Sequence, residues 1–284
     1  MKCIFVTDLH GHIKRFKALF KTIANEKPDA VFIGGDILPN QFLIDDSVDS
    51  FIDKELLKPI KKVKEKVGKN IRFFVIMGND DPRVFEKKFL MADKEKIIDY
   101  VNFKTVKFND LFVTGYCYVP PTPFQLKDWE RYDVSRFVDV GAVSPEEGIR
   151  TVEVDKDEII YSTISEDLKK LVKNSPTDKT IFLFHSPPYN SNLDRADLDN
   201  KHVDNAPLDT HIGSIAIQRF IEKNQPYLTL HGHVHESFRL TDKWMEKKGK
   251  TVSISAAYDG PELAVVSFET NDIEKATWKL IKII

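Results

Sequence analysis

Short apolar runs alternate over most of this chain with segments that have the periodicity of an amphipathic helix. Strands that alternate with helices in this way are typical of βαβ units, in which parallel strands share one sheet. Beyond residue 251 the pattern consists of strand-like runs alone. That change predicts antiparallel strands near the end of the chain, with a second sheet as one arrangement. The sequence therefore predicts an α/β protein with a largely parallel core.

The predicted elements cover most of the chain. The strands are Lys2–Val6, Ala30–Ile33, Ile71–Met77, Thr180–Phe184, Pro226–Leu230, Thr251–Ala256, Leu263–Phe268 and Ala276–Ile281, with a hairpin over Phe103–Tyr118. The helices are Ile13–Asn25, Asp45–Val67 with a break at Pro59, Ser165–Lys173 and Gly213–Lys223. Two stretches fit neither pattern, and we interpret them as insertions at about 120–150 and 186–211 in a single domain of residues 1–284.

The composition argues against several classes of protein. With 42 basic and 44 acidic residues, the chain has a net charge of −2 and no bulk attraction for nucleic acid or an anionic membrane. Cys3 and Cys117 have the spacing of neither a disulfide framework nor a zinc finger. No stretch approaches the roughly 18 apolar residues of a membrane span, and the apolar start is too short for a signal peptide. We expect a soluble, cytoplasmic protein.

Five predicted strands run directly into polar residues that can bind metal ions. These residues are, in chain order, Asp8 and His10, Asp36, Asn79 with Asp80, His185, and His233 with His235. In a parallel sheet, ligands bind just outside the carboxyl ends of the strands. Residues i and i+2 of an extended chain point to the same side, so each of the pairs Asp8/His10 and His233/His235 can reach one ion. The sequence therefore predicts a metal site at this edge of the sheet.

The predicted ligands are carboxylate or amide oxygens and imidazole nitrogens, without thiolate. Such a set suits Mn, Fe or Zn better than Ca or Cu(I). The seven candidate ligands exceed what one ion needs, and two ions that share a carboxylate would use them all. Each motif also has an ordinary interpretation by itself; the run Asn79–Pro82, for example, is typical of a turn and a helix N-cap. Their occurrence together at five strand ends favours a metal centre.

These motifs resemble the signature of the calcineurin-like metallophosphoesterases, which reads D-x-H, G-D, G-N-H-D/E, H and G-H-x-H. All five blocks occur in order between residues 5 and 235. The resemblance implies two mixed sheets packed face to face with helices outside, and hydrolysis of a phosphate ester by a metal-bound hydroxide. It also implies two divalent ions, for which we favour Mn. One would be held by Asp8, His10, Asp36 and His235, and the other by Asp36, Asn79, His185 and His233.

The chain departs from this signature at Asp80, where the family usually has a His. In the family, that His contacts the phosphoryl group and helps to protonate the leaving oxygen. An ionised Asp cannot donate a hydrogen bond, and two nearby cations would keep Asp80 ionised at neutral pH. We therefore expect a phosphoesterase that favours phosphodiesters, with Asp80 as the catalytic-site residue that sets the substrate class.

The long connection after His185 supplies the remaining candidates. His211 lies just before a predicted helix, and we expect it to face the phosphate and to replace part of the missing acid function. Backbone N–H groups at a helix start bind phosphate readily. The candidate substrate-binding residues are Arg195, His202, Gly213 and Ser214. The alternative is that 186–210 is a solvated loop, in which Asp209 or Thr210 caps the helix.

Three functions remain open at this point: a phosphoesterase for small-molecule phosphate esters, a nuclease of the same family, and a non-catalytic scaffold with this fold. The near-neutral charge weighs against a nuclease, because the basic run Lys54–Lys69 is more typical of a solvated helix face. A scaffold is disfavoured because no metal ligand is lost. We expect Trp129 and Tyr132 of the first insertion to pack internally. The sequence leaves the natural substrate, the metals and the oligomeric state open.

Overall fold

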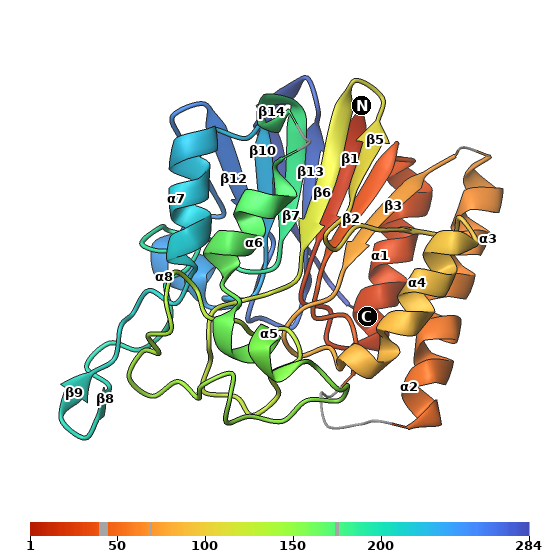
Figure 1. Ribbon diagram of the computed structural model, residues 1–284. Coiled ribbons are helices and arrows are strands. Elements are labelled where there is room, and N and C mark those ends of the chain that lie inside the picture. Colours follow the sequence, from red (N-terminus) through yellow and green to blue (C-terminus); the bar gives the residue numbers. More distant parts are fainter. Residues whose placement is uncertain (40–44, 69, 174–175, 284) are drawn as a thin grey trace.

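The computed structural model describes residues 1–39, 45–68, 70–173 and 176–283, and its core consists of two mixed sheets of six strands each. The sheets pack face to face, with α1 (Ile13–Glu26) beside the first sheet and α7 (Ile215–Asn224) beside the second (Figure 1). Their faces approach closely at Gly115, where an added Cβ would lie 2.5 Å from the side chain of Ile76 on the opposite sheet. The predicted architecture of two mixed sheets with helices outside is thus confirmed.

The first sheet has the strand order β14-β13-β1-β2-β3-β4. Its strands are β1 (Lys2–Val6), β2 (Ala30–Gly34), β3 (Arg72–Ile76), β4 (Asp99–Tyr100), β13 (Leu263–Glu269) and β14 (Asp272–Ile281). The first four are parallel, whereas β13 runs antiparallel to β1 and β14 runs antiparallel to β13. The central strands lack polar alternation because both of their faces are buried.

The second sheet has the order β11-β12-β10-β7-β6-β5. Its strands are β5 (Thr105–Phe108), β6 (Leu111–Tyr116), β7 (Thr180–Phe184), β10 (Leu228–His231), β11 (Met245–Lys248) and β12 (Thr251–Ser255). The predicted hairpin is β5–β6, and β6 also pairs in parallel with β7. The prediction of antiparallel terminal strands is confirmed for β13 and β14, whereas β12 pairs antiparallel with β11 but parallel with β10. The charged strand β11 had no apolar pattern to reveal it, and its presence reverses the direction of the strand that follows.

Four helical regions were predicted, whereas the helices over Glu86–Lys94, Lys156–Tyr161 and Ser237–Thr241 were not. The helices are α1, α2 (Asp46–Phe51), α3 (Lys58–Val67), α4 (Glu86–Lys94), α5 (Lys156–Tyr161), α6 (Ile164–Leu171), α7 and α8 (Ser237–Thr241). Between α2 and α3 the chain makes a π-helical stretch over Ile52–Leu57. This stretch ends beside Pro59, which has no N–H to give to the carbonyl of Glu55, so the predicted break is a change of hydrogen-bond pattern.

The two insertions are folded against the rest of the chain. In the first, Trp129 is fully buried and its Nε1–H donates to the carbonyl of Asp81 at 2.9 Å, and Tyr132 is also buried, as expected. The second carries a small hairpin of β8 (His202–Val203) and β9 (Ala206–Pro207), which projects from the molecule (Figure 1).

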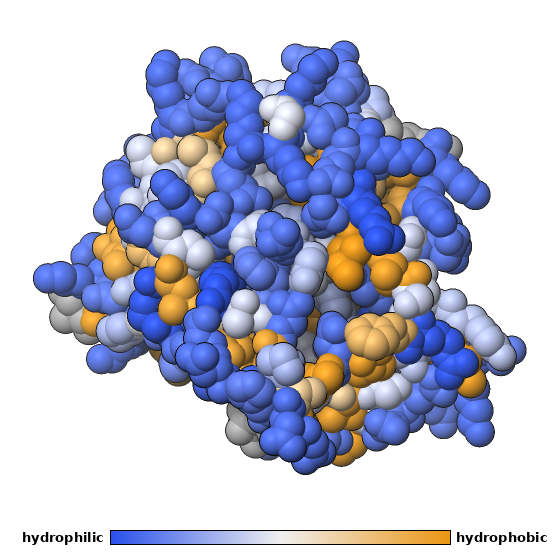
Figure 2. Space-filling model, turned by 90° about the vertical axis from the view of Figure 1, so that its left-hand side faces the viewer, coloured by the Kyte–Doolittle hydropathy of each residue, from blue (hydrophilic) through white to orange (hydrophobic). Residues whose placement is uncertain are grey.

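Figure 2 shows a face that is mainly hydrophilic, with apolar side chains in its lower half interrupted by polar ones. In the parts of the chain that the structure describes, no helix combines the length and the apolar character needed to cross a membrane.

Candidate metal centre

The predicted ligands lie at one edge shared by the two sheets. Asp8, Asp36 and Asn79 follow β1, β2 and β3 of the first sheet, whereas His185 and His233 follow β7 and β10 of the second. Contacts across the sheets join the two sets, since the Nε2 of His185 lies 3.1 Å from the Oδ1 of Asn79. The face-to-face packing of the sheets therefore assembles the site from five strand ends.

One group of four side chains has the geometry of a cation site. One ligand atom from each of Asp8, His10, Asp36 and His235 lies within 4.8 Å of all the others. The Nε2 atoms of His10 and His235 are 3.1 Å apart, and the latter is 3.2 Å from the Oδ1 of Asp8. Carboxylate oxygens and imidazole nitrogens that converge in this way fit a divalent cation of the Mn, Fe or Zn type.

A second group surrounds the ring of His185. Its Nε2 lies 3.3 Å from the Oδ2 of Asp36, while its Nδ1–H donates to the carbonyl of Gly34 at 2.7 Å. A backbone carbonyl on one ring nitrogen is the usual arrangement for an imidazole whose other nitrogen binds a metal. The rings of His185 and His233 have centroids 5.3 Å apart. Asp36 contacts both groups, because its Oδ2 also lies 3.8 Å from the Nε2 of His10.

The backbone at these ligands is bent. Asp8, His10, Asp36 and His233 have φ values of 55°, 44°, 50° and 74°, in the left-handed region that residues other than glycine seldom adopt. Asp8 and His10 therefore converge through a turn. The extended geometry that we assumed is wrong for this pair and also for His233/His235, where the chain bends at His233. Such backbone strain is concentrated at functional sites in proteins. Gly78 leaves room for the carboxylate of Asp36, since an added Cβ would lie 2.2 Å from its Oδ1.

Opposite charges dominate the electrostatics of the site. Burial lowers the pKa of His185, but the nearby Asp36 outweighs it and raises that pKa to about 10. Burial also lowers the pKa of His235, but the nearby carboxylate of Asp8 outweighs it and raises that pKa to about 9. The pKa of Asp36 lies well below its usual range, because His185 and His10 outweigh its burial. By contrast, burial lowers the pKa of His233 to about 3. The carboxylates thus attract positive charge, which imidazole protons or a cation can supply.

Asp81 is a structural residue of the site that the sequence interpretation missed. Its fully buried carboxylate accepts hydrogen bonds from the backbone N–H groups of Ile37 at 2.9 Å, Leu38 at 2.7 Å and Gly78 at 2.9 Å. It therefore fastens the loop after β2 to the loop after β3. The helical turn that starts at Arg83 has no side-chain cap, so the N-cap interpretation of this run is wrong. The sequence signal that could have identified Asp81 was its position in the run Asp80-Asp81-Pro82.

Asp80 lies at the rim of the cluster. Its Oδ1 accepts a hydrogen bond from the Nδ2 of Asn79 at 3.0 Å, and its Oδ2 is 3.7 Å from the Nδ1 of His10. Burial, followed by the carboxylates of Asp36 and Asp81, raises the pKa of Asp80 to about 8. A divalent cation at the neighbouring ligands would act in the opposite direction.

His211 belongs to a buried carboxylate network in the second insertion. Its Nδ1 lies 2.7 Å from the Oδ1 of Asp194, which is fully buried, and its side chain remains 26% exposed. The same insertion is fastened beside the metal ligands, because the N–H of Asp197 donates to the Oε1 of Glu236 at 3.1 Å. Glu236 directly follows His235. The insertion thus starts at one candidate ligand and is attached next to another.

The groups at the start of α7 that we expected to bind phosphate already form hydrogen bonds within the protein. Asp133 accepts hydrogen bonds from the Oγ of Ser214 and the N–H of Ile215, both at 2.6 Å. The N–H of Gly213 donates to the Oδ2 of Asp194 at 3.1 Å. The expected role of Gly213 and Ser214 in binding phosphate is therefore corrected, because Asp194 and Asp133 already accept their hydrogen bonds. Ser214 is the N-cap, so the helix begins two residues later than predicted.

Two other predicted substrate contacts lie in the second insertion. Arg195 pairs with Asp199 at 2.7 Å. His202 is exposed, and its ring contacts the carbonyl of Asn200 at 2.9 Å, in the projecting hairpin. In the described residues, neither side chain has a contact with the metal-ligand cluster.

The fold and this cluster together define the class of metallophosphoesterase-fold proteins. A family model described as "Calcineurin-like phosphoesterase" matches residues 1–237. The chain belongs to the calcineurin-like phosphoesterase family, whose members are metal-dependent phosphoric ester hydrolases. The resemblance inferred from the five motifs is thus confirmed.

Solved structures agree with this fold at low sequence identity. The protein TT1561 of Thermus thermophilus is 13% identical, with a TM-score of 0.58 and 99% of each chain covered. A dimetal phosphatase from Danio rerio is 10% identical, with a TM-score of 0.53 and coverage of 100% of this chain and 96% of that chain. A comparison with curated proteins gives no match.

Proposed function

We propose that this chain is a dinuclear metal-dependent phosphoesterase that hydrolyses small-molecule phosphodiesters in preference to monoesters. The observation that carries the proposal is the position of Asp36 between the two ligand groups. Its Oδ2 lies 3.8 Å from the Nε2 of His10 and 3.3 Å from the Nε2 of His185. One carboxylate in contact with both groups is the arrangement that a shared ligand of two ions requires.

The residues of each group would hold one ion. The first set is Asp8, His10, Asp36 and His235, and the second is Asp36, Asn79, His185 and His233. Bound divalent cations would supply Lewis-acid activation of water and positive charge for the transition state. Oxygen and nitrogen donors without thiolate suit Mn, Fe or Zn, and of these we propose Mn.

The protein side chains position these groups and need not form a covalent bond to the substrate. Gly34 fixes the ring of His185 through the Nδ1–H bond, so that the Nε2 faces Asp36. The backbone N–H of Asp80 donates to the Oδ1 of Asp36 at 2.9 Å. This hydrogen bond keeps the carboxylate of Asp80 at the rim of the ligand cluster. The backbone strain at Asp8 and Asp36 favours a preorganised site, because strain of this kind persists only when the surrounding structure fixes it.

The preference for diesters rests on Asp80. A phosphomonoester brings up to two negative charges to the site, whereas a diester brings one, and repulsion by a carboxylate scales with that charge. Asp80 also provides no imidazolium to protonate a leaving alkoxide. We therefore propose a substrate with one negative charge at phosphorus and a leaving group that needs little protonation.

The proposal is tested with purified protein that has been loaded with Mn²⁺. Metal content is measured by inductively coupled plasma mass spectrometry, and hydrolysis is measured for phosphomonoesters, cyclic nucleotides and linear diesters. We expect two metal equivalents per chain and the highest kcat/KM for diesters. Full metal loading without hydrolysis of any ester would contradict the proposal and favour the scaffold function.

A further inference from the structure

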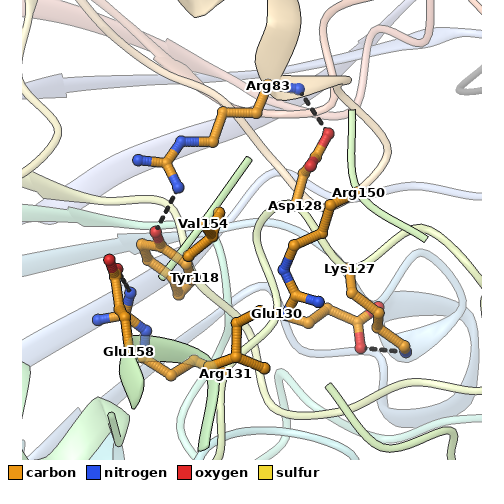
Figure 3. Close-up of a pocket in the computed structure, with 10 residues that line it drawn as sticks. Arg83, Tyr118, Lys127, Asp128, Glu130, Arg131, Arg150, Val154 and Glu158 are labelled. Carbon is orange, nitrogen blue, oxygen red and sulfur yellow. Dashed lines mark hydrogen bonds and ion pairs between the residues drawn. The ribbon is translucent and has the colours of Figure 1, made fainter. Parts of the chain in front are cut away.

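The loop after β3 carries Asn79 and Asp80 and leads into a helical turn that starts at Arg83. The residue before this turn, Pro82, forms no side-chain cap, and the first N–H groups of a helical turn have no partner within the turn itself. The first insertion supplies one, because the N–H of Arg83 donates to the Oδ2 of Asp128 at 2.8 Å (Figure 3). A segment distant in sequence therefore fixes the start of this turn.

The next residue of the turn is bound in the same way. The N–H of Val84 donates to the Oγ1 of Thr151 at 3.0 Å, and Thr151 directly follows the first insertion. Asp128 and Thr151 are joined to each other, because the N–H of Thr151 donates to the Oδ1 of Asp128 at 2.9 Å. These two residues therefore bind adjacent N–H groups of the turn as one unit.

Trp129 binds the same stretch of chain just before its proline. Its Nε1–H donates to the carbonyl of Asp81 at 2.9 Å, and its ring centroid lies 5.1 Å from the Cζ of Arg83. The indole is fully buried. Its own backbone is joined to the chain that follows β6, since the N–H of Val119 donates to the carbonyl of Trp129 at 2.9 Å. Trp129 therefore connects the end of a strand in the second sheet to the loop that carries Asn79.

Asp81 extends this attachment to two of the candidate ligands. Its carboxylate accepts hydrogen bonds from the N–H groups of Gly78 and Ile37, both at 2.9 Å. Gly78 directly precedes Asn79, and Ile37 directly follows Asp36. A displacement of Asp81 would therefore change how Asn79 lies relative to Asp36.

The contact between the insertion and the turn is closely packed. Arg83, Tyr118 and Asp128 are among the residues that line a cavity there of about 10 Å³, which is about the room that one water molecule needs (Figure 3). The Nη1 of Arg83 lies 3.4 Å from the Oη of Tyr118, and the rings of Tyr118 and Trp129 pack edge to face with centroids 5.4 Å apart. Packing of this density transmits a displacement from one segment to the next.

We propose that the first insertion positions the loop that carries Asn79 and Asp80, with Trp129 as its main positioning residue. If the loop were released, it would spend only part of the time in the conformation that a metal ion needs, and the apparent affinity would fall by that fraction. Of the seven proposed ligands, only Asn79 lies in this loop. The effect on a bound ion rests on the proposed dinuclear centre, whereas the positioning of the loop does not.

Amide hydrogen exchange of the full chain in EDTA, measured by NMR, tests the positioning without any metal. Trp129→Phe keeps an aromatic ring but removes the donor to Asp81. We expect the N–H groups of Gly78 and Asp80, which donate to the carboxylates of Asp81 and Asp36, to exchange about tenfold faster in this variant. That factor corresponds to one hydrogen bond left unmade at a buried group. The amides of β1 should exchange as in the native protein.

Tyr132→Phe is the matched control, because it removes the hydroxyl of another buried aromatic residue of the same insertion. That hydroxyl contacts the Oγ of Ser144 at 2.9 Å and makes no contact with the loop among the described residues. Thr151→Val removes the acceptor of the Val84 N–H from a half-buried side chain, and serves if Trp129→Phe does not fold.

Unchanged exchange at Gly78 and Asp80 in every folded variant of Trp129 and Thr151 would overturn the positioning role. Equal acceleration in Tyr132→Phe, or throughout β1, would also overturn it, because it would show a loss of overall stability alone.

Calorimetric titration of the metal-free protein with Mn²⁺ then measures the consequence for the candidate centre. We expect Trp129→Phe to weaken one of two Mn²⁺ equivalents about tenfold, at the lower end of the effect of an outer-shell partner, and the other much less. Equal affinities in the native protein and the variant would exclude any effect of the insertion on the metal. If the native protein binds fewer than two ions, the proposed dinuclear function fails, while the exchange rates still decide the positioning role.

Discussion

The Oδ2 of Asp36 and the Nε2 of His185 lie 3.3 Å apart, although their residues follow strands of different sheets. This contact couples the sheets at the candidate metal centre. Because both side chains are buried, the pair needs a positive charge close to the carboxylate. The geometry therefore makes Asp36 the residue whose charge matters most for cation binding.

We predict that Asp36→Asn removes most metal and activity but preserves the fold. Asparagine keeps an oxygen that can accept the Asp80 N–H but removes the negative charge. The loss of metal affinity should exceed the roughly 10–100-fold typical of an outer-shell partner. Metal content, circular dichroism and turnover are measured together, with the exposed Asp199→Asn as control. Native metal content and turnover in Asp36→Asn would exclude it as a shared ligand.

Metal binding is predicted to release protons at pH 7. The pKa values of His185 and His235, raised to about 10 and about 9, leave both rings protonated in the metal-free protein at this pH. A cation needs neutral imidazole, so each ring must give up its proton, and affinity should rise with pH. His233 gives up none, because its pKa is lowered to about 3. Calorimetry in buffers of different ionisation enthalpy measures the release. Metal affinity that stays constant from pH 6 to 8 would contradict these protonation states.

The local patterns of the sequence predicted an α/β fold and the candidate ligands, whereas the arrangement of two sheets followed from the resemblance to the family. Apolar runs mark buried strands, and polar residues directly after them stand out. The left-handed backbone at Asp8 and His10 was not predictable from spacing, because it depends on the surrounding loops. The bonds that Asp81 and Asp133 make to distant backbone donors were missed for the same reason. Partners far apart in sequence leave no local signal.

Asp133 is predicted to stabilise the folded state through α7. Its carboxylate accepts hydrogen bonds from the Oγ of Ser214 and the N–H of Ile215, both of which would lose their partner in Asp133→Ala. We expect the free energy of unfolding to fall by about 1–3 kcal/mol, the typical effect of leaving buried donors unpaired. Urea denaturation measures this change. Asp157→Ala, at an exposed carboxylate, is the control and should change stability by less than about 0.5 kcal/mol. Equal stabilities of the two variants would exclude the capping role.

His211 is predicted to assist departure of the leaving group. The Oδ1 of Asp194 lies 2.7 Å from the Nδ1 of His211, and among the described residues no hydrogen bond reaches the Nε2 of this ring. A positioned general acid contributes about 10²–10⁴-fold to the rate, so His211→Ala should slow alkyl esters by that factor and nitrophenyl esters much less. The exposed His202→Ala is the control. Rate constants for both ester types are compared, and an equal, small effect on the two would remove His211 from the mechanism.

Asp80 is predicted to set the preference between diesters and monoesters. Two cations at the neighbouring ligands should keep its carboxylate ionised, against the burial that raises its pKa to about 8 without them. An ionised Asp80 repels a monoester dianion more than a diester monoanion. We therefore expect the native protein to cleave bis-nitrophenyl phosphate faster than nitrophenyl phosphate.

Asp80→His should shift this ratio towards monoesters, because it removes a negative charge and introduces a donor for the phosphoryl group. Asp80→Asn is the matched variant, since it removes the charge without providing an acid. A shift in both variants would assign the effect to charge, whereas a shift in Asp80→His alone would assign it to proton donation. The test is kcat/KM for both esters in all three proteins with the same metal. A native preference for monoesters, or an unchanged ratio in both variants, would show that Asp80 does not set the substrate class. Its role would then be limited to the contacts with Asn79 and Asp36 that hold the loop after β3.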